Sequence, residues 1–264
     1  MPVLESHAPG TPSFVDLGSP DPDASAAFYG GLFGWAVTDD AAEEYGGYRM
    51  FLLDGHVVAG LGPQQNPGRP YWTTYVTVTS VDDAVDRVTA AGGSVLAPAI
   101  DVFDAGRMAV VADPEGTVFS VWEPRQSIGT EVVNEPGALT WNELTCRDPD
   151  GAKGFYAAVF GWTPNEVDSD GMPYVEWQLD GRPVGGMMPM VGDEWPGPDE
   201  LPSHWMVYFA VDDTDAAAAR CAELGGEVPV PPTDIPPGRF AVLTDPQGAV
   251  FSVIKMAVPL GAPS

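Results

Sequence analysis

The chain of 264 residues is poor in basic and in metal-binding side chains. Its 11 lysines and arginines stand against 38 aspartates and glutamates, for a formal net charge of −27, and it has only 3 histidines and 2 cysteines. Such a charge repels phosphate backbones and anionic membrane surfaces. We therefore expect no nucleic-acid partner and no membrane partner.

Long apolar runs are missing as well. No run approaches the roughly 20 residues of a membrane span, and the opening MPVLESHAPGTPS has neither a basic nor an apolar leader region. These features favour a cytoplasmic protein. Cys146 and Cys221 cannot form a disulfide framework or a Cys-rich zinc site, and we expect both to be small core residues.

What the sequence does contain is an internal repeat. The segment LGSPDPDASAAFYGGLFGW at residues 17–35 returns as LTCRDPDGAKGFYAAVFGW at residues 144–162. Likewise, GRMAVVADPEGTVFSVWEP from Gly106 returns as GRFAVLTDPQGAVFSVIKM from Gly238. Self-similarity in the same order indicates a tandem duplication. We predict an N-terminal tail at residues 1–11 and a first domain at residues 12–124. A linker at residues 125–137 leads to a second domain at residues 138–256.

Each copy is predicted to be α+β, with two β-α-β-β-β units. In the first unit, Asp-Pro supplies an N-cap and a first-turn proline for a helix. The Asp-Gly pairs at Asp54 and Asp180 predict hairpins. The pattern then begins again with a strand, a helix and two strands around the Asp-Pro-x-Gly turns at Asp113 and Asp245.

Two sets of motifs carry a resemblance to a known family. They are Asp-Pro followed by Phe-Tyr and Phe-Gly-Trp near the start of each copy, and Asp-Pro-x-Gly-x-x-Phe-Ser-Val near its end. The chain resembles the glyoxalase/bleomycin-resistance/extradiol dioxygenase superfamily, the vicinal oxygen chelate proteins. It looks most like the duplicated actinobacterial members often labelled hydroxylases. The resemblance implies that the two units of each copy form a curved eight-stranded sheet around a cavity.

The resemblance also implies where a metal would bind, on the first, fourth, fifth and eighth strands of each copy. Serine and glycine stand at two of these positions and cannot replace a carboxylate. His7 and His56 lie elsewhere, in the tail and after a hairpin turn. Glu143 and His204 are fewer than the three protein ligands of a catalytic metal site. We therefore expect neither a metal nor another cofactor. On the first strand the position is Phe14 or Asp16 in the first copy and Trp141 or Glu143 in the second. On the other three strands the positions are Gly60 and Gly186, Thr73 and Met206, and Ser120 and Ser252.

Strand alternation predicts which neighbours share the cavity face with these positions. The second copy has the more polar set, so we expect the two copies to differ in task. Glu143 and His204 are the candidate catalytic groups, and the others are candidate ligand-binding residues. In the second copy the face comprises Trp141, Glu143, Glu176, Gln178, Met188, His204, Met206, Tyr208 and Ser252. In the first copy it comprises Phe14, Asp16, Met50, Leu52, Thr73, Tyr75, Ser120 and Trp122.

Other prominent residues have structural interpretations. The aromatic residues of the first helix of each copy fit core packing. Arg107 and Arg239 fit loop anchors that pair with a nearby aspartate. The aromatic residues in question are Phe28, Tyr29, Phe33 and Trp35, and Phe155, Tyr156, Phe160 and Trp162.

Two functional hypotheses follow, and the sequence leaves open whether the chain is an enzyme. The first is a metal-free protein, monomer or homodimer, that sequesters, carries or acts on a small hydrophobic or aromatic secondary metabolite. The alternative is a secondary-metabolism enzyme, such as a hydroxylase, isomerase or cyclase, with Glu143 as general acid or base. A metal-dependent lyase or dioxygenase comes third.

Overall fold

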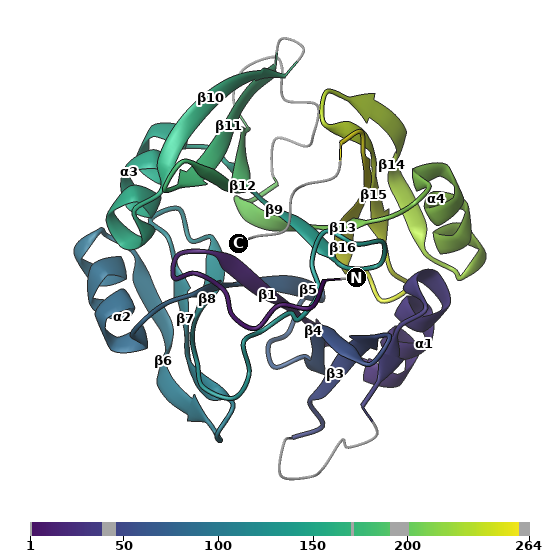
Figure 1. The fold of residues 1–264 in the computed structure, drawn as a ribbon, viewed down its shortest axis with the longest axis horizontal. Coiled ribbons are helices and arrows are strands. Elements are labelled where there is room, and N and C mark those ends of the chain that lie inside the picture. The colour runs from purple at the N-terminus through teal and green to yellow at the C-terminus, as the bar shows by residue number, and fades with distance from the viewer. Residues whose placement is uncertain (1, 39–45, 170–171, 191–200, 259–264) are drawn as a thin grey trace.

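The computed structural model describes residues 2–38, 46–169, 172–190 and 201–258. They form two eight-stranded sheets with the strand orders β2-β3-β4-β1-β5-β8-β7-β6 and β10-β11-β12-β9-β13-β16-β15-β14 (Figure 1). In each sheet the first strand of one unit pairs antiparallel with the first strand of the other unit. The predicted α+β class with two tandem eight-stranded sheets is confirmed. Of the helices in the described ranges, none is long and apolar enough to cross a membrane.

The elements follow the same order in both copies. The first copy comprises β1 (Pro12–Ser19), α1 (Pro22–Phe33), β2 (Ala36–Val37), β3 (Arg49–Leu53), β4 (His56–Pro63), β5 (Tyr71–Thr77), α2 (Val81–Ala90), β6 (Ser94–Val102), β7 (Gly106–Ala112) and β8 (Val118–Pro124). The second comprises β9 (Leu139–Cys146), α3 (Pro149–Phe160), β10 (Thr163–Ser169), β11 (Met172–Leu179), β12 (Arg182–Pro189), β13 (His204–Ala210), α4 (Thr214–Glu223), β14 (Glu227–Ile235), β15 (Gly238–Thr244) and β16 (Val250–Met256).

Local sequence accounts for the first helix of each copy. The side chains of Asp21 and Asp148 accept hydrogen bonds of 3.0 Å from the backbone N–H groups of Ala24 and Gly151, as N-caps do. Each helix ends at a glycine in the left-handed region, where a side chain would be strained. The repeated motif therefore encodes one capped helix per copy.

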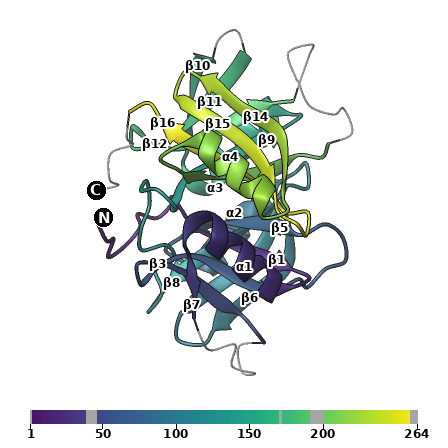
Figure 2. The ribbon, with the colours of Figure 1, turned by 90° about the vertical axis from the view of Figure 1, so that its right-hand side faces the viewer.

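The two copies share their cores. One buried apolar cluster joins the first unit of the first copy to the second unit of the second copy, and another cluster joins the remaining two units. Accordingly, α1 lies beside α4, and α2 lies beside α3 (Figures 1 and 2). The predicted core residues of the two first helices lie in these clusters, as do both cysteines, which are buried and free.

Reciprocal hydrogen bonds cross between the copies. The Tyr29 hydroxyl on α1 donates to Asp245 of the second copy at 3.1 Å, and the Tyr156 hydroxyl on α3 donates to Asp113 of the first copy at 3.1 Å. Each aspartate also accepts from backbone N–H groups of its own turn. The Asp-Pro-x-Gly turns are thus both turn residues and attachment points for the other copy.

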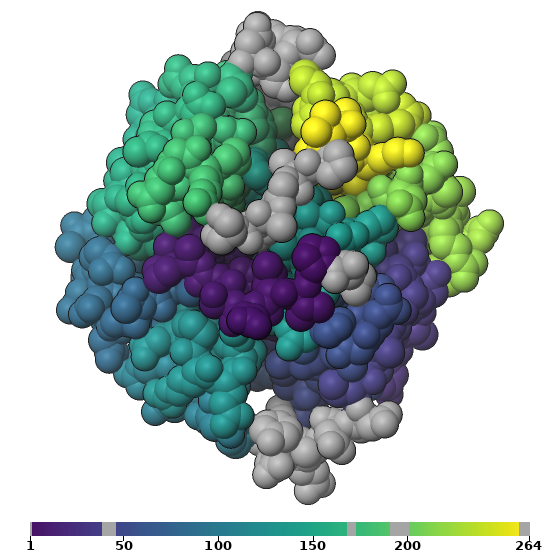
Figure 3. All heavy atoms as spheres, viewed as in Figure 1, coloured from purple at the N-terminus to yellow at the C-terminus, as the bar shows by residue number. Residues whose placement is uncertain are grey.

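The N-terminal tail contacts both copies. Its Gly10 N–H donates to Thr77 of the first copy at 2.7 Å, and the Gly10 carbonyl accepts from the Trp162 indole of the second copy at 2.7 Å. The space-filling view shows the purple tail lying across the boundary between the copies (Figure 3).

Candidate functional site

Each sheet has one face that is turned away from the helices, which we call the inner face. On β13, Trp205, Val207 and Phe209 lie in the helix-side cores. Because side chains alternate along a strand, His204, Met206 and Tyr208 lie on the inner face. The same alternation places Glu143 on the inner face of β9, where it pairs directly with Met206.

In the second copy, the inner face carries a carboxyl group between two tyrosines. Glu143 is 7% exposed and accepts a hydrogen bond of 2.9 Å from the Tyr208 hydroxyl, and Tyr174 is its second donor. The Trp141 indole donates to the Tyr174 hydroxyl at 2.9 Å. Side chains from β9, β11 and β13 therefore meet in one hydrogen-bonded chain.

Burial decides the ionisation of this group. Desolvation raises the pKa of the Glu143 carboxyl, and the hydrogen bonds from Tyr208 and Tyr174 oppose that rise only in part. Arg239 does not offset this burial with its positive charge, because it bonds Asp215 and Asp234 instead. Glu143 is therefore a buried acid whose neutral form is favoured by its surroundings.

The first copy holds a matching cluster around Asp16. The hydroxyls of Tyr75 and Tyr48 donate to the same oxygen, Oδ2, at 2.7 Å and 3.0 Å. Thr73 is a third donor, which the second copy lacks because Met206 takes its place. Burial also raises the pKa of Asp16. Asp16 therefore has more hydrogen-bond donors from the protein than Glu143 has.

Tyr48 and Tyr174 are the site residues that sequence reasoning missed. A Cβ atom at Gly60 would collide with the Tyr48 hydroxyl, and one at Gly186 would collide with the Tyr174 hydroxyl. Each tyrosine thus occupies the space where a ligand side chain on the fourth strand would begin. A signal was present, since both tyrosines stand six residues before the aspartate of an Asp-Gly turn.

Two serine hydroxyls complete the clusters. Ser120 and Ser252 are fully buried, and their Oγ atoms have no partner with hydrogen-bond geometry among the described residues. Ser120 pairs in register with Tyr75, and Ser252 with Tyr208, on the neighbouring strands. Burial raises the pKa of each tyrosine, and the neighbouring serine opposes that rise in part. A buried hydroxyl without a partner is costly, so Ser252 is a candidate contact for a ligand.

The two inner faces differ in what surrounds the clusters. In the first copy, Phe14, Tyr75 and Trp122 form a buried apolar cluster with Met50 and Met108 packed against it. The Trp122 indole also donates to the Ser127 carbonyl of the linker at 3.0 Å. The first inner face is therefore filled by its own apolar side chains.

The second inner face is more polar. Gln178 donates to Glu176 at 2.9 Å, and Asn165 donates to Glu176 at 3.3 Å. The half-buried Met188 pairs in register with Thr145. His7 Nε2 lies 2.7 Å from the Thr130 carbonyl oxygen and His56 Nδ1 lies 3.5 Å from the Glu131 carboxylate, both in the linker.

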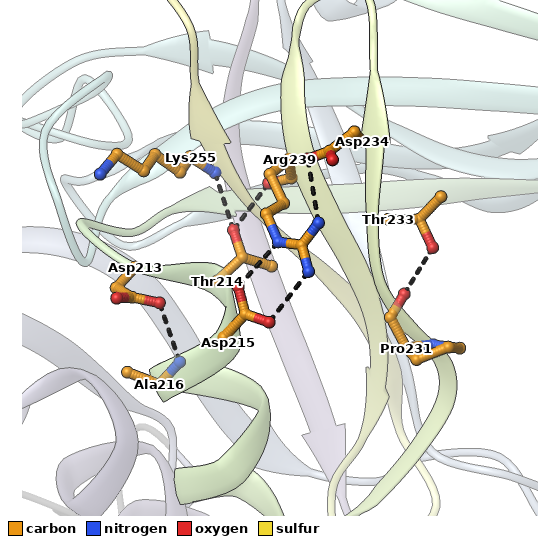
Figure 4. A network of polar contacts seen from close by, with 9 residues as sticks. All are labelled: Asp213, Thr214, Asp215, Ala216, Pro231, Thr233, Asp234, Arg239 and Lys255. Carbon is orange, nitrogen blue, oxygen red and sulfur yellow. Dashed lines mark hydrogen bonds and ion pairs between the residues drawn. The ribbon is translucent and has the colours of Figure 1, made fainter.

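Arg239 and Arg107 anchor loops, as their sequence context predicted. Arg239 forms two bonds to Asp215 at the start of α4, of 2.7 Å and 2.9 Å, and one of 2.9 Å to Asp234 on β14 (Figure 4). Arg107 bonds Asp82 in the corresponding place at 2.9 Å. These arginines are engaged by exposed carboxylates on the helix side of the sheets.

A family model described as a glyoxalase-like domain matches residues 14–122 and again residues 138–254. The chain belongs to the glyoxalase-like family. It is 45% identical to "Putative glyoxylase CFP32" of Mycobacterium tuberculosis, over 97% of this chain and 99% of that protein. It is 40% identical to "Anthracycline biosynthesis protein DnrV" of Streptomyces peucetius, over 96% of each chain.

Solved structures share the fold of this glyoxalase-like chain at low identity. The Mn(II)-bound glyoxalase from Novosphingobium aromaticivorans superposes with a TM-score of 0.62 at 19% identity, over 95% of this chain and 86% of that one. The 2,3-dioxygenase LapB from Pseudomonas sp. KL28 superposes with a TM-score of 0.66 at 12% identity, over 96% of this chain and 94% of that one.

The fold family implies a divalent metal, but the residues at the implied positions do not fit one. Glu143 is the single carboxylate in its cluster, with Met206 and Ser252 on the neighbouring strands and the Tyr174 hydroxyl over Gly186. Across the described ranges, no three His, Cys, Asp or Glu side chains gather as a metal-binding group. We derive no metal-dependent step for this chain.

We predict that calorimetric titration with Fe(II), Ni(II), Zn(II) or Mn(II) gives no stoichiometric binding. The physical reason is that one carboxylate cannot replace the roughly three protein ligands of a catalytic site. One-to-one binding of micromolar affinity that Glu143→Ala abolishes would contradict the prediction.

Proposed function

We propose that this chain binds a flat, hydrophobic, aromatic secondary metabolite on the inner face of its second sheet. The observation that carries the proposal is the Glu143 cluster, a buried carboxyl group between tyrosines at the place where the fold family implies a metal. Aromatic walls with a few placed polar groups are the usual form of a small-molecule site. The relative named for anthracycline biosynthesis supports this ligand class, because anthracyclines are planar and aromatic.

Charge argues against an anionic ligand. Glu143 and Glu176 lie on this face, and the chain as a whole carries a formal charge of −27. An anionic ligand would meet repulsion with no cationic group among the residues described around Glu143 to offset it. A resistance or carrier role in the cytoplasm, by a monomer or homodimer, agrees with the proposal.

A second candidate function is catalysis with Glu143 as general acid or base. The raised pKa of this carboxyl favours it, since an acid tuned toward neutral pH is suited to proton transfer. Isomerase or cyclase chemistry needs only proton transfer and agrees with this group. Simple binding needs no titrating group, so the two functions are separable by measurement.

The test is a fluorescence titration with quinizarin, a planar dihydroxyanthraquinone. We expect saturable one-to-one binding that Trp141→Leu weakens by about tenfold or more, because an aromatic contact adds stabilisation beyond its buried area. The matched control is Phe14→Leu, which makes the corresponding change on the closed inner face of the first copy. We expect this control to bind as the unaltered protein does.

Absence of saturable binding would overturn the proposal. Equal losses from the two substitutions would contradict the assignment to the second copy. Circular dichroism of both variants separates a lost contact from a lost fold.

A further inference from the structure

His204 and Glu143 are neighbours on the inner face of the second sheet. Met206 pairs directly with Glu143 across β13 and β9, and His204 pairs with Thr145. His204 is therefore the diagonal neighbour of Glu143, a relation in which Cα atoms lie about 7–8 Å apart. A small ligand lying between the two side chains can contact both.

The hydrogen bond of His204 fixes its tautomer. Its Nδ1 lies 2.9 Å from the Pro202 carbonyl oxygen. Because a carbonyl only accepts, Nδ1 carries the proton and Nε2 keeps its lone pair. Burial lowers the pKa of His204, with the Pro202 bond opposing in part, so the ring is neutral at neutral pH. His204 Nε2 is then a base.

Glu143 is the complementary acid. Burial raises the pKa of the Glu143 carboxyl, the protonated form of this group can donate a proton, and the tyrosine hydroxyls hold the side chain in place. The unpartnered Ser252 hydroxyl, beside Tyr208, is a further donor for an oxygen of the ligand. Groups whose environments push their pKa values in opposite directions divide acid and base roles between them.

The first copy lacks this pair. Tyr71 stands at the register position of His204, two residues before Thr73, and is 44% exposed. Asp16 is also held by a third donor, Thr73. The acid and base therefore occur together in one copy only, which makes the first copy an internal control.

We propose that His204 and Glu143 catalyse the enolisation of a ketone carried by the bound aromatic molecule, a role that rests on the proposed binding function. The proton on the carbon next to the carbonyl moves to His204 Nε2, and the C–H electron pair forms the carbon–carbon double bond. The carbonyl π pair takes the proton of Glu143. The product is a neutral enol beside an imidazolium and a carboxylate. Return of a proton from the imidazolium to the same carbon, with the carboxylate taking back the enol proton, reverses the step. Because the imidazolium exchanges its proton with water in between, that carbon gains a solvent hydrogen, with no oxidant or reductant.

The test is hydrogen–deuterium exchange of β-tetralone, a flat bicyclic ketone with acidic C–H groups, followed by proton NMR in deuterated buffer. We expect the protein to accelerate exchange above the buffer rate. His204→Gln and Glu143→Gln should each reduce the protein-dependent rate by about 10²–10⁴-fold, the usual contribution of general acid–base catalysis. Both changes keep a hydrogen-bonding side chain of similar size. Tyr71→Phe, the matched change at the position of His204 in the first copy, should leave the rate unchanged.

Binding is measured in parallel by tryptophan fluorescence, which keeps the two proposals distinguishable. Exchange at the buffer rate while β-tetralone is bound overturns the enolisation and leaves the binding function standing. Failure of β-tetralone to bind when quinizarin binds overturns the ketone class. Failure of both ligands to bind overturns the binding function and the enolisation with it. An unchanged rate in either Gln variant removes that residue from the reaction.

Discussion

Trp162→Ala should lower the free energy of unfolding by about 3–5 kcal/mol, as large-to-small changes of buried aromatics do. The Trp162 side chain is fully buried and lies 5.4 Å, between ring centroids, from the stacked Tyr156 ring. It also contacts Trp177 and Trp205 in the cluster that joins the two copies. Because a domain has only about 5–15 kcal/mol of net stability, the loss should be visible as a large shift of the urea midpoint.

The shape of that unfolding curve tests the shared core. Since each cluster takes residues from both copies, Trp162→Ala should shift a single transition of the whole chain. Trp162→Phe, which keeps a ring but loses the hydrogen bond to the Gly10 carbonyl, should cost only about 1–2 kcal/mol. A curve in which the second copy alone unfolds early would contradict the shared core.

Stability should fall as the pH rises from the ordinary carboxyl pKa values through the raised values of the folded protein. Burial raises the pKa values of four carboxyl groups, Asp16, Asp113, Glu143 and Asp245, above the ordinary values of 3.8 for aspartate and 4.5 for glutamate. Between the ordinary and the raised pKa, the folded protein binds more protons than the unfolded chain. The free energy of unfolding therefore decreases with pH in that interval.

The size of this effect follows from the number of groups. Each unit by which a pKa is raised changes stability by about 1.4 kcal/mol, and self-repulsion of the −27 charge acts in the same direction. Asp215 and Glu166 have lowered pKa values because of Arg239 and Lys153. These pairs are exposed and screened, so they oppose the trend weakly.

Urea unfolding across this pH range measures the slope. The double variant Asp16→Asn/Glu143→Gln removes two of the four titrating groups, and we expect it to flatten the dependence. A stability that stays constant or increases with pH would show that the buried carboxyl groups are not protonated in the folded state.

The helix caps and the tight turns were predictable from the sequence because the interactions that fix them are local. The Asp-Pro caps and the Asp-Gly turns depend on backbone groups within a few residues. Asp54 and Asp180 indeed adopt positive φ angles of 50° and 51°, each before a glycine. The arginine anchors were inferred from residue chemistry, since guanidinium groups suit carboxylates.

The tyrosine clusters were only partly predictable. Alternation placed Asp16, Tyr75, Glu143 and Tyr208 on the inner faces. Tyr48 and Tyr174 were missed, although alternation from Met50 and Glu176 reaches both, because their contacts with Gly60 and Gly186 on the next strand have no local signature. The space left by a missing side chain is filled by a residue from a neighbouring strand, and Tyr48 stands 32 residues from Asp16.

The sequence alone determined the duplication, the capped helices and the hairpin turns, because short-range backbone chemistry specifies them. The strand faces and the positions of the two carboxyl groups came from strand alternation counted from positions that the family resemblance implies. Only the tertiary structure decided that each core draws on both copies, that Tyr29 and Tyr156 bond aspartates of the opposite copy, and that Glu143 has two donors where Asp16 has three. These features depend on which distant surfaces pack together. Burial, which sets the pKa of Glu143, results from that packing and has no local signature in the chain.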